Sequence, residues 1–155
     1  MRAAAKALLT VLLTAASPAG AAVVMECGEW VGADTLIEPW EETTRTFSRG
    51  SVRVAAVDLG EPECCPQHLI VLIPANMYQG RFCALVARNA LVPNGWIKVG
   101  IREARAFRPG TGGLHVSVPV YSYDFTTGGA DPDSRRVLTL RVRQAAGTVE
   151  LVDSE

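Results

Sequence analysis

The residues of this chain best suited to chemistry are a cluster of sulfur and imidazole side chains. Three of the four cysteines lie between residues 61 and 88, and the densest part is the run Cys64-Cys65-Pro66-Gln67-His68. Thiolate, thioether and imidazole groups are the ligands that copper(I) and zinc prefer. The candidate metal ligands are Cys64, Cys65, His68 and Cys83, with Met77 near by if the flanking apolar runs form a hairpin.

The same cysteines support a simpler interpretation, in which all of them are oxidised. Their spacing lacks the Cys-x-x-Cys pattern of known zinc modules. An even number of thiols in an exported chain is typical of disulfides. We therefore predict that Cys27, Cys64, Cys65 and Cys83 form two disulfides, and that the protein carries no metal or other cofactor.

Four cysteines allow three pairings, and the adjacency of Cys64 and Cys65 disfavours one of them. Pro66 pushes Cys65 towards an extended backbone, on which neighbouring side chains point to opposite sides. Consecutive Cα atoms lie about 3.8 Å apart, which is short of the usual disulfide range. In the chain-entropy model, loops of about 37 and 19 residues stabilise by about 7 kcal/mol, against about 5.5 for a 57-residue loop plus a vicinal bond. We therefore expect Cys64 and Cys65 to bond to Cys27 and Cys83, in either combination.

The N-terminal residues have the pattern of a cleaved secretory signal peptide over residues 1–21. Arg2 and Lys6 make a positive start, residues 7–16 are apolar, and Ala19-Gly20-Ala21 is a small-residue cleavage site. The apolar stretch is too short to span a bilayer. We expect residues 22–155 to form a single periplasmic or secreted domain, with no membrane span after cleavage and in a compartment where disulfides persist.

Charge gives little indication of a partner. The chain has 15 Lys and Arg against 16 Asp and Glu, and both signs are scattered along the sequence. No basic stripe suits a nucleic acid or an anionic membrane. We therefore expect no nucleic-acid partner, which leaves a protein or a small ligand.

Short apolar runs between Gly and Pro turns predict an all-β domain. The runs 68–73 and 81–87 are apolar at consecutive positions, which is typical of strands covered on both faces at the centre of a sheet. The other predicted strands are residues 43–47, 52–59, 96–107, 114–120, 136–143 and 148–152. About eight antiparallel strands of this size predict a small sandwich or barrel, stapled by the two disulfides.

Several positions depart from a simple strand pattern. We expect a register shift near Ala55-Ala56, and a bulge near Ile101 in preference to a short helical turn over residues 102–107. Pro119 cannot donate to a strand ladder, so an edge strand or a bulge is expected there. Residues 26–40 show no clear element, and residues 126–134 are expected to form a flexible polar loop.

No group of residues predicts catalysis. The chain has only two histidines, His68 and His115, and no Gly-x-Ser-x-Gly motif. Ser117 shares a strand face with His115, but parallel side chains do not aim a base at a nucleophile. Asp124 and the run Asp131-Pro132-Asp133-Ser134 lack the Gly and Glu positions of a calcium-binding loop.

The last candidate is an aromatic strip formed by Tyr121, Tyr123 and Phe125. The strip is either an exposed binding surface or a second core face of the sandwich, and we expect the core because most such stripes are buried. The sequence thus predicts an exported, non-catalytic binding or accessory protein of the cell envelope. The alternative is a periplasmic copper- or zinc-handling protein that uses the cysteine cluster.

Overall fold

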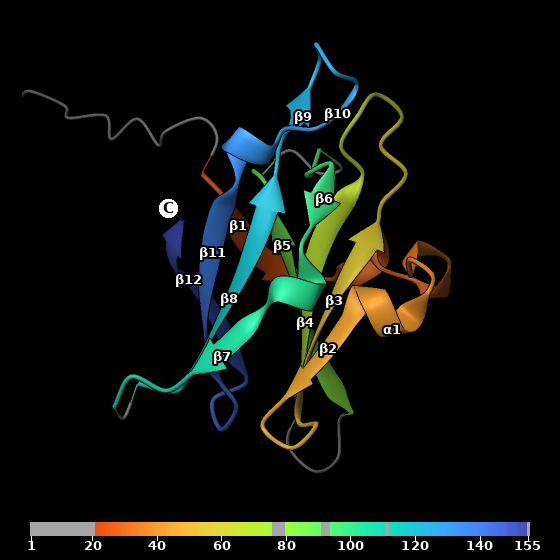
Figure 1. The fold of residues 1–155 in the computed structure, drawn as a ribbon. Coiled ribbons are helices and arrows are strands. Elements are labelled where there is room, and N and C mark those ends of the chain that lie inside the picture. Colours follow the sequence, from red (N-terminus) through yellow and green to blue (C-terminus); the bar gives the residue numbers. More distant parts are fainter. Residues whose placement is uncertain (1–20, 76–79, 91–93, 111, 155) are drawn as a thin grey trace, which may run out of the picture.

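Two antiparallel β-sheets lie face to face in the computed structural model, which describes residues 21–75, 80–90, 94–110 and 112–154 (Figure 1). This arrangement confirms the predicted all-β, sandwich-like fold. The predicted signal peptide over residues 1–21 and the candidate ligand Met77 lie outside the described residues, apart from Ala21. Within the described ranges, no helix is long and apolar enough to cross a membrane.

The first sheet has the strand order β1-β5-β4-β3-β2. Its strands are β1 (Val23–Glu26), β2 (Thr44–Phe47), β3 (Val52–Asp58), β4 (Gln67–Pro74) and β5 (Arg81–Ala87). The two continuous apolar runs form β4 and β5, so β4 lies at the centre as predicted. Alternate side chains of β4 belong to two hydrophobic clusters. Leu69 and Val71 face the second sheet, whereas Ile70 faces the outside of the sandwich.

The outer face of the first sheet is covered by the segment between β1 and β2. It contains three short helices: η1 (Gly28–Trp30), η2 (Ala33–Thr35) and α1 (Trp40–Thr43). Val31 and Trp40 from this segment pack on the cluster of Ala55, Val57 and Ile70. This cover explains why the central strands are apolar on both faces.

The second sheet has the order β12-β11-β8-β6, and β7 also pairs with β8. Its strands are β6 (Lys98–Val99), β7 (Arg105–Phe107), β8 (Leu114–Tyr121), β11 (Arg136–Arg143) and β12 (Thr148–Ser154). The remaining elements are the two-stranded ribbon of β9 (Tyr123–Asp124) and β10 (Gly129–Ala130), and the 3-10 helices η3 (Ile101–Glu103) and η4 (Pro132–Ser134). Alternate residues of β8 and β11, such as Val116 and Leu140, fill the core between the sheets.

The predicted register shift near Ala55-Ala56 is wrong. Both alanines are buried, and their pairing with β4 runs without interruption, with Ala55 opposite Ile70 and Ala56 opposite Leu69. Because this sheet is covered on both faces, two consecutive buried alanines fit an ordinary strand, and no bulge is needed to bury both.

The expected bulge near Ile101 is also wrong, since the chain leaves the sheet there as the 3-10 helix η3. Pro119 lies opposite the point where the chain leaves the sheet. It belongs to β8, which is an interior strand and not an edge strand. Gly100 donates its N–H to the Pro119 carbonyl at 2.8 Å. In an antiparallel strand, the N and C=O of one residue face the same neighbour, so the missing N–H of Pro119 faces the interruption between β6 and β7. The proline therefore costs the sheet no ladder bond.

Candidate binding surface

The first disulfide joins Cys27 to Cys83, with a Cα–Cα distance of 5.5 Å. Strand β1 pairs with β5 so that Glu26 lies opposite Ala84, and the next residue, Cys27, falls beside Cys83. The backbone N–H of Cys27 donates to the Cys83 carbonyl at 3.1 Å. The register of β1 therefore selects this pairing.

The second disulfide is the vicinal bond Cys64–Cys65, so the predicted connectivity is wrong. Both residues precede β4, whereas Cys83 lies opposite Leu72 near the other end of that strand. The six residues from Gln67 to Leu72 span about 17 Å of strand, which separates the two sites. The sequence argument failed because β1 was not recognised, and without it nothing assigned Cys27 to Cys83.

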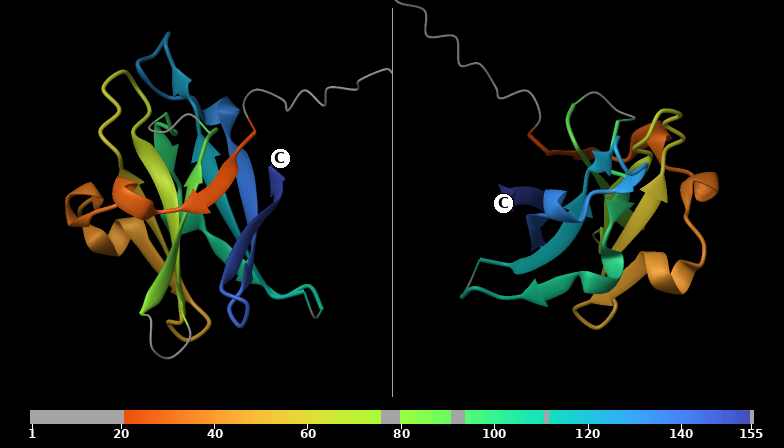
Figure 2. Two further views of the ribbon diagram at one scale, coloured as in Figure 1. Left: turned by 180° about the vertical axis from the view of Figure 1, so that it is seen from behind. Right: turned by 45° about the horizontal axis from the view of Figure 1, so that its top comes forward.

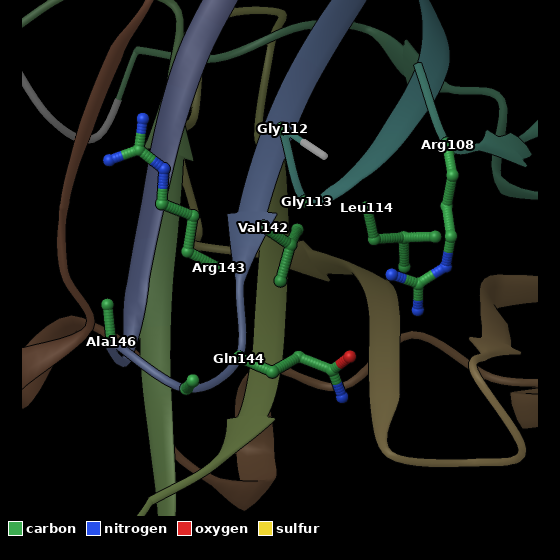
Figure 3. Close-up of a pocket in the computed structure, with 9 residues that line it drawn as sticks. Arg108, Gly112, Gly113, Leu114, Val142, Arg143, Gln144 and Ala146 are labelled. Atoms are coloured by element: carbon green, nitrogen blue, oxygen red, sulfur yellow. The ribbon is translucent and has the colours of Figure 1, made fainter. Parts of the chain in front are cut away.

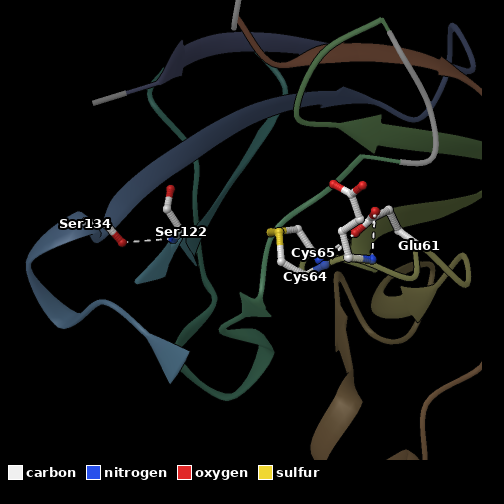
Figure 4. Close-up of a disulfide and its surroundings, with 6 residues drawn as sticks. Glu61, Cys64, Cys65, Ser122 and Ser134 are labelled. Carbon is white, nitrogen blue, oxygen red and sulfur yellow. Dashed lines mark hydrogen bonds between the residues drawn. A yellow bond between two sulfur atoms is a disulfide. The ribbon is translucent and has the colours of Figure 1, made fainter. Parts of the chain in front are cut away.

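The carboxylate of Glu61 organises the loop that holds the vicinal disulfide (Figure 4). It accepts hydrogen bonds from the backbone N–H groups of Cys64 and Cys65, each at 2.8 Å, and of Glu63 at 3.0 Å. These donors, that of Cys64 foremost, hold the pKa of the Glu61 carboxyl below its ordinary value. The carboxylate therefore supplies the acceptors for a loop that makes no strand pairs of its own.

The proposed metal ligands are not arranged as a metal site. All four cysteine sulfurs are in disulfides, and no three Asp, Glu, His or Cys side chains of the described residues gather around a common point. His68 is fully buried beside Trp96, and its Nδ1 donates to the Pro66 carbonyl at 3.0 Å. Its Nε2 is buried without a protein partner, and burial lowers the pKa of the imidazole. His68 is thus a neutral core residue.

The polar groups weighed for hydrolysis or calcium binding have local roles. Nε2 of His115 accepts a hydrogen bond from Arg141 Nε at 3.4 Å. Asp124 accepts from Thr127 Oγ1 at 2.7 Å and from the Thr126 N–H at 2.8 Å, and these bonds lower the pKa of its carboxyl. Asp131 accepts from the Asp133 N–H at 2.8 Å and caps η4. These carboxylates hold their own turns in place.

The aromatic strip does not lie in the core, contrary to expectation. Phe125 is 85 % exposed, and Tyr121 and Tyr123 are only half-buried. After β8 the chain continues into the β9–β10 ribbon, which projects from one end of the sandwich in Figure 1 and in the left view of Figure 2. Among the described residues, no sheet covers Phe125 at that end.

Hydrogen bonds hold the ribbon that carries Phe125. The sequence had predicted a flexible polar loop over residues 126–134. The Gly128 N–H donates to the Asp124 carbonyl at 2.9 Å, and the Ser122 N–H donates to Ser134 Oγ at 2.8 Å. The Phe125 and Tyr123 rings meet edge to face, with centroids 4.9 Å apart and planes at 79°. The exposed ring therefore packs on Tyr123 in a geometry that aromatic pairs prefer.

Tyr121 connects the strip to the body of the domain. Its hydroxyl donates to Glu103 Oε1 at 3.2 Å, and Lys98 Nζ lies 5.0 Å from the centre of its ring. Charged groups therefore border the aromatic ribbon, as in the polar rim of protein interfaces.

Comparison with known proteins found no match among family models, curated proteins or solved structures. The functional argument therefore rests on the surfaces of the molecule itself.

Sequence reasoning missed a cluster of arginines at the opposite end of the sandwich. Arg49 lies in the β2–β3 turn, and two other arginines reach the same turn: Arg108 donates from Nη2 to Ser48 Oγ at 3.2 Å, and Arg81 from Nη1 to the Ser51 carbonyl at 3.5 Å. The available signal was that the turns at residues 48–51 and 144–147, and the sequence ranges 75–80 and 108–113, contain no Asp or Glu.

Proposed function

We propose that this chain is an exported, non-catalytic binding protein of the cell envelope, and that Phe125 is its main contact residue. The observation that carries the proposal is a phenyl ring 85 % exposed on a hydrogen-bonded ribbon that projects from the sandwich. Burying such a ring against a partner removes a large apolar surface from water, worth about 1.5–3 kcal/mol. A free protein gains nothing from holding this ring in solvent.

The geometry of the strip favours a protein partner over a sugar. A flat stacking platform needs coplanar rings, whereas the Tyr123 and Phe125 rings stand at 79° to each other. A projecting aromatic beside a polar rim matches the anchor residues of protein interfaces, which insert into a pocket of the partner. We therefore expect the partner to present an apolar cavity.

A binding role without catalysis agrees with the state of the reactive groups. Within the described residues, the cysteines are in disulfides, His68 is buried, and His115 accepts from Arg141. The N-terminal pattern and the two disulfides together support export to an oxidising compartment. Titration of free thiols in the purified, non-reduced protein tests this point. Four reactive thiols would contradict it and favour the metal-handling alternative.

The binding role is tested by a photo-crosslinking residue, p-benzoylphenylalanine, at position 125 in cells of the native host. The matched control carries the same residue at Val152, an exposed apolar side chain on β12, far from the ribbon in sequence. We expect one discrete adduct in the envelope fraction from position 125 and none from position 152.

Competition decides whether such an adduct is specific. An excess of the unmodified protein should suppress it, whereas an equal excess of the Phe125→Ala protein should not. That variant should unfold within about 0.5 kcal/mol of the parent, because an exposed side chain adds little to stability. Equal suppression by both proteins, or no adduct at position 125, would overturn the proposal.

A further inference from the structure

The end of the sandwich opposite the aromatic ribbon carries an uncompensated positive charge. Arg49, Arg81 and Arg108 are exposed, and none of them belongs to an ion pair found among the described residues. Arg143 lies in the same region but is paired with Glu150 at 3.4 Å. We call Arg49, Arg81, Arg108 and the pocket beside them the basic end.

The pocket of the basic end has a volume of about 600 Å³. Leu114 and Val142 lie between Arg108 and Arg143 in it, and Ala145 and Ala146 close one side (Figure 3). A second hollow of about 380 Å³ adjoins it around the same β11–β12 turn. An apolar floor bordered by guanidinium groups suits an aromatic side chain flanked by carboxylates.

The chain itself carries such a segment. Residues 26–42, here called the acidic segment, hold six carboxylates and no Lys or Arg: Glu26, Glu29, Asp34, Glu38, Glu41 and Glu42. All six residues are exposed, and only Glu42 is in an ion pair found among the described residues, with Arg102. Beside Glu29, the Trp30 ring is 46 % exposed.

We propose that the basic end of one molecule binds the acidic segment of a second copy of this chain. Trp30 would then enter the pocket lined by Leu114 and Val142, and Glu29 and its neighbouring carboxylates would meet the three arginines. The two surfaces adjoin at a hollow lined by both Arg81 and Glu26, whereas the pocket lies at the β11–β12 turn and Trp30 lies in η1, so each bound copy still presents its own pocket. Contacts of this heterologous kind produce rings of molecules where the rotation closes and open chains where it does not.

A second copy fits these observations better than a nucleic acid. The chain has a formal net charge of −1, which becomes −3 when Arg2 and Lys6 leave with the predicted signal peptide (13 basic against 16 acidic residues), so the field of the whole molecule does not attract a long polyanion. A nearly neutral molecule with segregated charges attracts its own kind, because little overall repulsion opposes the contact.

The expected association is weak and sensitive to salt. Exposed ion pairs are each weak, and salt screens them within about 8 Å at physiological ionic strength. Sedimentation velocity of the protein purified after export should show a sedimentation coefficient that rises with concentration at about 0.02 M salt and stays constant at about 0.3 M salt.

Two sets of charge reversals test the surfaces. One variant carries Arg49→Glu, Arg81→Glu and Arg108→Glu, and the other carries Glu29→Lys, Asp34→Lys and Glu41→Lys. Each variant alone should be monomeric at low salt, because its two surfaces now repel each other. The single change Arg136→Glu, at an exposed site outside both surfaces, should leave the association of the parent unchanged.

Mixing the two variants makes the test decisive. The intact acidic segment of the first meets the intact basic end of the second, so the mixture should associate although neither component does. Circular dichroism of each variant alone shows whether it is folded. A parent that is monomeric at every salt concentration, or a mixture of folded variants that stays monomeric, would overturn the proposal.

Discussion

Arg45 donates a hydrogen bond from Nη1 to the backbone oxygen of Ala104 at 2.9 Å, and so joins the edge strand of one sheet to the other sheet. The same nitrogen reaches the Arg102 carbonyl at 2.6 Å, at the end of η3. Phe47 lies below the guanidinium, whose carbon is 5.9 Å from the ring centre. Arg45 thus ties the open edge of the sandwich together, as does Arg108, which donates to Ser48.

Replacing Arg45 with Met should lower the free energy of unfolding by about 1–3 kcal/mol, because charge-assisted hydrogen bonds to two carbonyls are lost. Urea denaturation measures the effect. Thr46→Ala, at the exposed neighbouring residue, is the control and should change the midpoint little. Equal free energies of unfolding for the Arg45 variant and this control would show that the Arg45 hydrogen bonds do not stabilise the fold.

The two disulfides should contribute very unequally to stability. Cys27–Cys83 links residues 56 apart, whereas Cys64–Cys65 links neighbours. In the chain-entropy model, replacing the first pair with serine costs about 4 kcal/mol, and replacing the second costs about 1 kcal/mol. Non-reducing urea denaturation of the two double variants checks this order. Peptide mapping of the oxidised protein checks the pairing directly, since a Cys27–Cys64 or Cys27–Cys65 link would contradict it.

The free energy of unfolding of the domain should decrease as the pH is lowered, because of His68. Burial lowers the folded-state pKa of this imidazole below its usual value of 6.5, although the nearby charge of Asp58 acts the other way. The unfolded chain then binds more protons than the folded one between the two pKa values, so stability is complete above about pH 6.5 and is lost as the pH falls below it. Within that interval the slope reaches up to about 1.4 kcal/mol per pH unit.

His68→Leu should remove this slope without leaving an unpaired carbonyl, because the Pro66 oxygen still accepts from the Leu59 N–H at 3.0 Å. Urea midpoints measured at intervals between about pH 5.5 and pH 7.5 avoid the titration of most carboxylates. Identical pH profiles for the parent and the His68→Leu protein would refute this account.

Gly95 should tolerate no side chain. A Cβ atom at this position would lie 2.3 Å from the backbone oxygen of Gln67 and 2.6 Å from Cε1 of His68. Gly95→Ala should therefore destabilise the fold by about 1–3 kcal/mol, as overpacking does elsewhere. The matched control is Gly129→Ala, where a Cβ meets nothing within 4 Å and the φ angle is not positive. Equal melting temperatures for the two variants would contradict the proposed close approach.

The sequence by itself determined the elements that depend on local patterning. The period-two alternation of residues 136–143 and the continuous apolar runs 68–73 and 81–87 predicted strands that the structure contains, because side-chain burial in a sheet follows the order of residues directly. The same patterns predicted the all-β class and the buried centre of the first sheet.

The tertiary structure decided whatever depends on which distant segments lie side by side. The short strand β1 places Cys27 beside Cys83, and three segments from different parts of the chain bring Arg49, Arg81 and Arg108 together. The exposure of Phe125 likewise depends on the place of the β9–β10 ribbon, which pairs with neither of the two five-stranded sheets among the described strands. Neighbours along the chain set the first kind of feature, whereas strand register and long-range packing, which no local pattern encodes, set the second.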